Sequence, residues 1–128
     1  MTLTHVSPDG IAPGNGYSHV VWGTGRFIAV SGQIALDEDG ALVGGSDPEA
    51  QTRQVFENLR RCLEAAGVGF ADVLKLTIFL TDPAVLPAVR VVREEYLTDP
   101  RPACSLVQVV ALARPDLLLE IEAYAIAP

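Results

Sequence analysis

The spacing of apolar residues predicts two helices. Between residues 47 and 66, apolar side chains recur every three or four positions and form one stripe, made of Val55, Leu59, Cys62, Leu63 and Ala66. Ser46 or Asp47 can cap this helix, and Pro48 suits its first turn. A similar apolar spacing predicts a second helix over residues 83–97.

Alternation and short apolar runs between turn residues indicate the strands. In residues 72–81, one face holds Leu74, Leu76, Ile78 and Leu80, and the other holds Lys75 and Thr77. Further strands are expected at residues 17–22, 27–32, 104–112 and 117–126, with a short segment at 41–43 and an extended lead-in over residues 1–16. This order predicts an α+β fold in which one mixed sheet carries two helices on one face.

Composition narrows the class of protein. The chain has 128 residues, which fits a single domain over residues 1–128. The formal net charge of −7 disfavours a nucleic-acid partner, because phosphate backbones attract clustered Lys and Arg. No apolar run approaches the roughly 20 residues of a membrane-spanning helix, and the first residues lack a signal-peptide pattern, so we expect a cytoplasmic protein without a membrane partner. The apolar share of 49% is high and favours a covered subunit interface.

The sequence predicts neither a metal site nor a disulfide. The two cysteines, Cys62 and Cys104, and the two histidines, His5 and His19, do not form a zinc-ligand pattern. The glycine pairs at 14–16 and 23–25 lack the context of a nucleotide-binding fingerprint and are interpreted as turns.

Three local features each have a structural and a functional interpretation. Ser31-Gly32 ends an apolar strand, where glycine permits a bulge or leaves room for a ligand. Glu120 and Glu122 share one face, which is either a solvated sheet face or a place where a carboxylate deprotonates a water in a cleft. Cys104 is either a small buried thiol or a nucleophile, which would need a base partner.

Several motifs, taken together and in order, resemble one family. The resemblance lies in Ser31-Gly32-Gln33, the helix followed by Ala65-Ala66-Gly67, the strand at 72–82, and the segments 101–105 and 119–123. They resemble the Rid family (reactive intermediate deaminase), also called YjgF and formerly labelled L-PSP endoribonuclease. The resemblance covers residues 16–126 and implies a chorismate-mutase-like fold. It also implies a homotrimer with a central barrel and ligand clefts between subunits.

The resemblance further implies an activity, the hydrolysis of 2-imino or 2-aminoacrylate acids to 2-keto acids and ammonia. It implies no cofactor, because the imine is already electrophilic. The partner would be a small anionic metabolite. Such a site has to hold the substrate carboxylate, place one water and move one proton.

Positions that match the family motifs give the candidate site residues. The residues matched to the walls, floor and strand backbone of the cleft are Tyr17, Ser31, Gly32, Ser105 and Leu106. Glu120 matches the carboxylate that positions water, and it is the first candidate catalytic residue.

The chain departs from the family pattern at Cys104, the second candidate catalytic residue. The pattern Pro-Ala-Arg-Ser has an arginine here that binds the substrate carboxylate, and a thiol cannot replace it. Losing such a contact should cost on the order of 2–5 kcal/mol. We hypothesise that Arg90, which stands where the family often has an asparagine facing the cleft, partly restores the positive charge. Arg101 is a weaker candidate. Solvation at the surface is expected for most of the arginines in this region, which include Arg93.

Four functions stay open at this point. An imine or enamine deaminase, or a related hydrolase with a shifted substrate, is favoured by Tyr17, Ser31, Gly32 and Glu120. A non-catalytic metabolite-binding or regulatory trimer is favoured by the missing arginine. Thiol chemistry at Cys104 is a third hypothesis. RNA cleavage, the older family label, is disfavoured by the acidic composition.

Overall fold

The computed structural model describes residues 3–128 and contains two helices and a mixed sheet. The elements are β1 (Leu3–Val6), β2 (Val20–Gly23), β3 (Arg26–Gln33), α1 (Pro48–Ala65), β4 (Val73–Leu80), α2 (Leu86–Tyr96), β5 (Ala103–Gln108) and β6 (Leu119–Ala127). The main sheet has the order β3-β6-β4-β5, in which only β4 and β5 are parallel. The predicted α+β class is confirmed.

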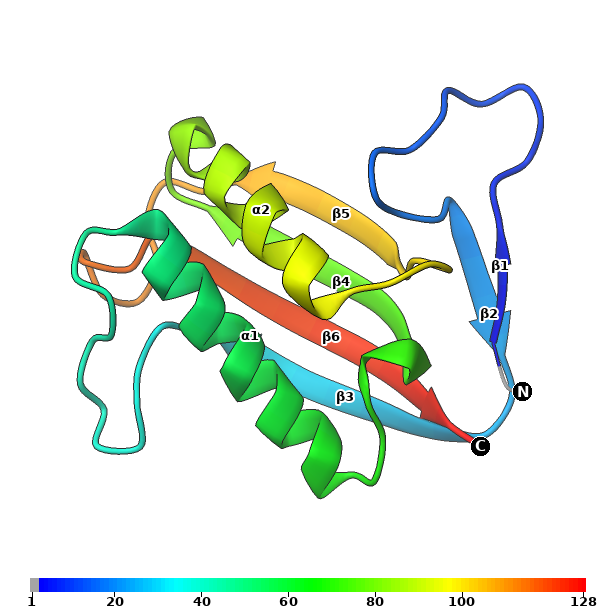
Figure 1. The fold of residues 1–128 in the computed structure, drawn as a ribbon, viewed down its shortest axis with the longest axis horizontal. Helices are drawn as coiled ribbons and strands as arrows, with labels where there is room; N and C mark the ends of the chain where they lie inside the picture. The colour runs from blue at the N-terminus through cyan, green and yellow to red at the C-terminus, as the bar shows by residue number, and fades with distance from the viewer. Residues whose placement is uncertain (1–2) are drawn as a thin grey trace.

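Both helices cover the same face of the main sheet, as predicted. Figure 1 shows α1 over β3 and β6, and α2 over β4 and β5. The core lies between these layers and includes the fully buried side chains of Phe56, Leu59, Leu63, Leu76, Ile78, Leu80, Leu119 and Ile121. The opposite face of the sheet carries no helix, so most side chains there are half-buried or exposed.

Local signals at both ends of α1 explain its bounds. Asp47 is the N-cap, and its side chain accepts a hydrogen bond of 3.0 Å from the amide of Glu49. Gly67 follows the last turn with φ +77°, a conformation that glycine adopts without strain, and the amide of Val68 donates to the carbonyl of Leu63. The predicted apolar stripe is buried in its centre, while Cys62 is only half-buried at its edge.

The structure corrects several sequence-based boundaries. The expected lead-in contains β1, and β1 pairs with β2 in a separate two-stranded sheet, so the strands do not form one sheet. The segment 41–43 makes a single bridge rather than a strand. The second helix begins only after a 3-10 turn at Pro83–Val85. The strand expected to reach residue 112 ends at Gln108, because its partner β4 ends at Leu80 and offers no further ladder.

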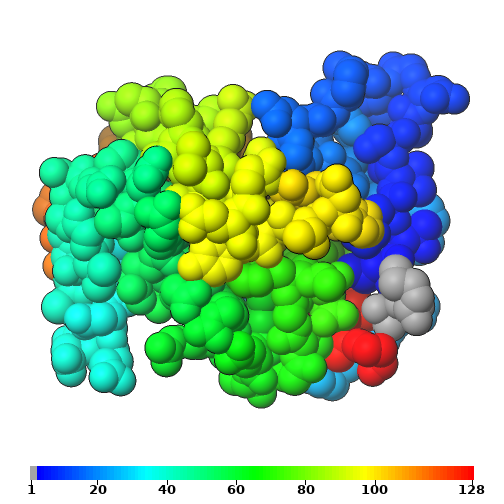
Figure 2. Space-filling model, viewed as in Figure 1, coloured from blue at the N-terminus to red at the C-terminus, as the bar shows by residue number. Residues whose placement is uncertain are grey.

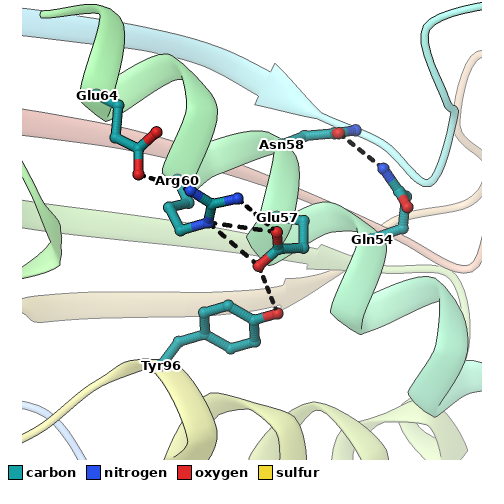
Figure 3. Close-up of polar contacts among 6 residues, drawn as sticks. All are labelled: Gln54, Glu57, Asn58, Arg60, Glu64 and Tyr96. Carbon is teal, nitrogen blue, oxygen red and sulfur yellow. Dashed lines mark hydrogen bonds and ion pairs between the residues drawn. The ribbon is translucent and has the colours of Figure 1, made fainter.

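A polar contact joins the two helices on their outer side. The hydroxyl of Tyr96 on α2 donates to Glu57 on α1 at 2.9 Å, and Arg60 also binds Glu57 (Figure 3). Burial, reinforced by the bond to Glu57, raises the pKa of Tyr96 to about 12. The Tyr96 hydroxyl therefore stays protonated and keeps its hydrogen bond to Glu57 across the physiological pH range.

A fully buried glutamine holds the loops at one end of the sheet. Nε2 of Gln51 donates to the carbonyls of Gly45 at 2.7 Å and Asp116 at 2.9 Å, and its Oε1 accepts from the amide of Leu118 at 3.0 Å. These bonds satisfy backbone groups from two loops that are far apart in the chain. The residues just after Leu118 begin β6, so Gln51 fixes where β6 enters the sheet.

We predict that Gln51→Leu lowers the free energy of unfolding by about 2 kcal/mol or more, because three backbone groups lose their partner. The matched control is Gln54→Leu, on the same helix, whose side chain donates to Asn58 alone at 2.9 Å. This control should cost about 1 kcal/mol or less. Urea unfolding at one fixed protein concentration measures both. Equal losses of unfolding free energy in the two variants would contradict the structural role given to Gln51.

Candidate functional site

A pocket of about 240 Å³ lies between α2, β5 and the segment before β2. The described residues that line it are Asn15, Tyr17, Ile78, Leu86, Val89, Arg90, Arg93, Cys104 and Leu106. We call it the arginine pocket. Figure 2 shows the N-terminal segment, in blue, packed beside the yellow-green surface of α2. Four of the eight candidate site residues, Tyr17, Arg90, Cys104 and Leu106, line this one pocket.

The register between β4 and β5 explains why Cys104 and Leu106 face α2. Cys104 pairs with Leu76 and Leu106 pairs with Ile78, and both partners are buried on the helix side of the sheet. Neighbouring residues on paired strands point to the same face. Ser105 pairs with Thr77 and therefore points to the opposite, helix-free face.

Arg93 is a pocket residue that the sequence analysis did not select. Its side chain is only 11% exposed, although it lies on a helix with charged neighbours. Burial lowers the pKa of the Arg93 guanidinium, but an arginine remains charged near neutral pH. The available sequence signal was its spacing, because Arg93 follows Arg90 by three residues and such pairs share a helix face.

Arg90 and Arg101 have different surroundings from Arg93. The side chain of Arg90 lines the pocket and is otherwise exposed. Arg101 lies outside the pocket lining, where Nη1 pairs with Glu94 at 2.6 Å and Nε pairs with Asp99 at 3.1 Å. Two carboxylates already pair with Arg101, which leaves it less available to an anionic ligand.

The thiol of Cys104 is half-buried at the base of this pocket. Burial raises its pKa, while the positive charges of Arg93 and Lys75 act in the opposite direction and do not outweigh burial. Among the described lining residues there is no histidine that would act as a base. These surroundings favour a protonated, unreactive thiol.

Three of the four remaining candidates, Ser31, Gly32 and Glu120, form a second group around a β-bulge, and Ser105 on β5 belongs to neither group. The pairs Val30–Ala123 and Gln33–Ile121 leave Ser31 and Gly32 of β3 opposite the single residue Glu122. The sequence interpretation of Ser31-Gly32 as a bulge is thus confirmed.

The missing side chain of Gly32 makes room for the carboxylate of Glu120. A Cβ at Gly32 would collide with Oε2 of Glu120, so only glycine lets this carboxylate lie against the backbone. Glu120 is half-buried, and the alternation of β6 puts it on the helix-free face with Glu122. We call Ser31, Gly32 and Glu120 the glutamate bulge.

Within one chain the two groups lie on opposite faces of the sheet. The arginine pocket is on the helix side at β5, whereas Glu120 projects from β6 on the other side, and β4 separates the two strands. Gly32 borders a different pocket of about 570 Å³, which shares no lining residue with the arginine pocket. The single chain therefore does not bring the predicted site residues together in one cavity.

The described part of the chain offers neither a metal-ligand cluster nor a membrane-spanning helix. Residues 3–128 contain no cluster of three His, Cys, Asp or Glu side chains positioned to hold a metal ion. Neither helix in this range is long and apolar enough to cross a membrane.

We predict that Cys104 is alkylated slowly by iodoacetamide at neutral pH. In a Cys62→Ser variant, where Cys104 is the single thiol, the rate should rise with a midpoint above the free-cysteine value of about 8.5, because burial disfavours the thiolate. The same variant unfolded in urea serves as the control and should show the free value. A midpoint below that of the unfolded chain would instead support the hypothesis that Cys104 is an activated thiol.

Comparisons with known proteins agree on one family. The Endoribonuclease L-PSP family model matches residues 8–127. A RutC family protein of Pyrococcus horikoshii is 40% identical over 124 residues, covering 96% of this chain and 94% of that protein. The 3-aminoacrylate deaminase RutC of Acinetobacter baylyi is 42% identical over 100 residues, covering 78% and 79% of the two chains.

Solved structures give the same result. A conserved Rid family protein from Yersinia pestis superimposes with a TM-score of 0.92 at 38% identity, covering 99% of this chain and 100% of that one. RidA from a Psychrobacter species gives a TM-score of 0.74 at 33% identity, covering 97% and 99%. Sequence and fold together show that this chain belongs to the Endoribonuclease L-PSP family, also called Rid or YjgF.

Proposed function

We propose that this protein hydrolyses a reactive 2-imino or enamine acid to a 2-keto acid and ammonia. The observation that carries the proposal is the Glu120 carboxylate held against Gly32, next to a bulge that leaves the backbone accessible. A relative that is 42% identical bears the name of a deaminase of 3-aminoacrylate, an enamine acid. We infer that this chain acts on the same broad class of compound.

The reaction centre would form between subunits of a homotrimer. Each chain offers the arginine pocket and the glutamate bulge on opposite faces, so a neighbouring subunit has to bring one group to the other. The exposed apolar side chains support such packing: Val20, Trp22, Phe27, Leu106, Val107 and Tyr124. Phe27 and Tyr124 stack at 5.5 Å on the helix-free face. A subunit packed against this face would cover them.

The chemistry would need one general base and no cofactor. Glu120 accepts a proton from a water molecule, whose oxygen adds to the carbon of the C=N bond. Glu120 returns this proton to the nitrogen, which gives a neutral carbinolamine. Glu120 then takes the proton of the carbinolamine hydroxyl and passes it to the nitrogen, so that the C–N bond breaks, the C=O bond forms and ammonia leaves. Atoms balance as imine plus water giving ketone plus ammonia. Ser31 and the bulged backbone beside Glu120 would orient the substrate and the water.

A second candidate function is metabolite binding without catalysis. It is supported by Cys104, which stands where the resemblance predicts a carboxylate-binding arginine. In this case the scaffold and clefts would be kept, while transition-state stabilisation would be lost. Activity measurements separate the two candidates.

We predict that the protein removes 2-iminopropanoate generated in situ by an amino-acid oxidase, so that semicarbazide traps less of it. Glu120→Gln should lower this activity by about 100-fold or more, because general-base catalysis contributes on that scale. Glu122→Gln is the matched control, since it removes a carboxylate two residues away on the same strand face. It should leave activity within about three-fold.

The Cys104→Arg variant is tested in the same assay. An inactive natural protein that gains activity with Cys104→Arg would favour metabolite binding as its function. Equal losses in Glu120→Gln and Glu122→Gln would refute the assigned role of Glu120.

We also predict a native mass near three times the chain mass of 13.6 kDa by light scattering. Phe27→Glu should shift it toward the monomer, because a charge would be buried in the apolar contact. Val91→Glu, which adds the same charge at an exposed apolar position on α2, should leave the mass unchanged. A monomeric natural protein would exclude a site built between subunits.

A further inference from the structure

The charges around the arginine pocket are unbalanced. Among the described lining residues two are arginines, Arg90 and Arg93, and none is acidic. The other lining side chains are mostly apolar, including Ile78, Leu86, Val89 and Leu106. A small cavity with positive charge at one place and apolar walls elsewhere fits an organic anion.

The guanidinium of Arg93 is poorly satisfied by the protein itself. Its Nε is buried and has no hydrogen-bond partner among residues 3–128. Nη1 donates only one long bond of 3.3 Å, to the carbonyl of Asn15, and the nearest carboxylate, that of Glu94, is 4.0 Å from Nη2. Glu94 also pairs more closely with Arg101, at 2.6 Å. Burying a charge with so few partners costs free energy unless a ligand supplies the missing hydrogen bonds and the opposite charge.

The backbone holds this guanidinium in place. Gly16 lies directly against it, and a Cβ at Gly16 would collide with the terminal nitrogens of Arg93. Gly16 also has φ +77°, which glycine adopts without strain. The segment Asn15-Gly16 thus packs on one side of the guanidinium, which fixes its position beside the pocket. A positioned guanidinium binds a carboxylate through two parallel hydrogen bonds.

We propose that Arg93 binds the carboxylate of the substrate and so replaces, from α2, the arginine that is absent at position 104. This inference rests on the proposed function, and it moves the main carboxylate contact from Arg90 to Arg93. Arg90, one helical turn away and exposed, attracts the anion at the pocket rim. The apolar walls select substrates whose remaining side chain is a short aliphatic group.

Binding of a stable product analogue tests the proposal separately from catalysis. The probe is 2-oxobutanoate, compared with its uncharged methyl ester, by titration calorimetry on the assembled protein. Arg93→Met should weaken 2-oxobutanoate binding by about 30-fold or more and leave ester binding within about two-fold, because only the acid makes the charge-assisted pair. Arg93→Lys, which keeps the charge but loses the planar fork, should give an intermediate loss and should fold even if Arg93→Met does not.

Two matched variants complete the experiment. Arg90→Met should weaken 2-oxobutanoate binding by less than about five-fold, and the loss should shrink with added salt, as for an exposed charge. Arg53→Met removes the same charge from α1 at a position that lines none of the pockets, and binding should not change.

The outcomes separate the inference from the proposed function. A loss of acid binding in Arg93→Met without deaminase activity in the natural protein would support the carboxylate site and refute deamination. Deaminase activity with unchanged acid binding in Arg93→Met and Arg93→Lys would refute the role of Arg93 and leave deamination standing. A larger loss in Arg90→Met than in Arg93→Met, or equal binding of acid and ester by the natural protein, would also overturn the inference.

Discussion

The parallel pairing of β4 with β5 is the constraint on which the site depends. Parallel neighbours cannot be joined by a tight turn, so the chain has to cross over the sheet between them, and it does so as α2. This crossover brings α2 above the residues of β5 that face the core. Arg93 and Cys104, which stand eleven positions apart in the chain, therefore line the same pocket.

The alternation of side chains along the strands then places the candidate site residues on both faces of the sheet. Cys104 and Leu106 face the helices, while Ser105 and Glu120 face the other way. The bulge at Ser31-Gly32 adds a local exception, because it lets the carboxylate of Glu120 rest against the backbone. A chain organised in this way holds the Glu120 carboxylate on one face of the sheet and the arginines of the pocket on the other. The proposed trimer would bring the two groups together across a subunit boundary.

Much of the fold was predictable from the sequence. The stripe of Val55, Leu59 and Leu63 predicted α1 and its buried side, and Asp47 was one of the two predicted caps. The strand β1 was missed because its four residues carry too weak an alternation to stand out beside the prolines and glycines that follow. The length of β5 was overestimated because the end of a strand depends on its partner, which lies more than twenty residues away in the chain.

The structure shows how the candidate site residues are grouped, which the sequence could not predict. Tyr17, Cys104 and Leu106 line one pocket, and the sequence could not show that Glu120 lies on the opposite face of the sheet in the same chain. Arg93 was passed over because a charged residue on a helix is usually solvated. Its burial depends on Asn15 and Gly16, which are distant in the sequence.

The close approach of Gly16 to Arg93 has an evolutionary consequence. A Cβ at position 16 would meet the guanidinium of Arg93, so a larger residue there requires the end of the Arg93 side chain to move. A homologue with a residue larger than glycine at position 16 should carry a shorter side chain at position 93. If Arg93 binds the carboxylate as proposed, position 93 should vary more freely in relatives that have an arginine at position 104.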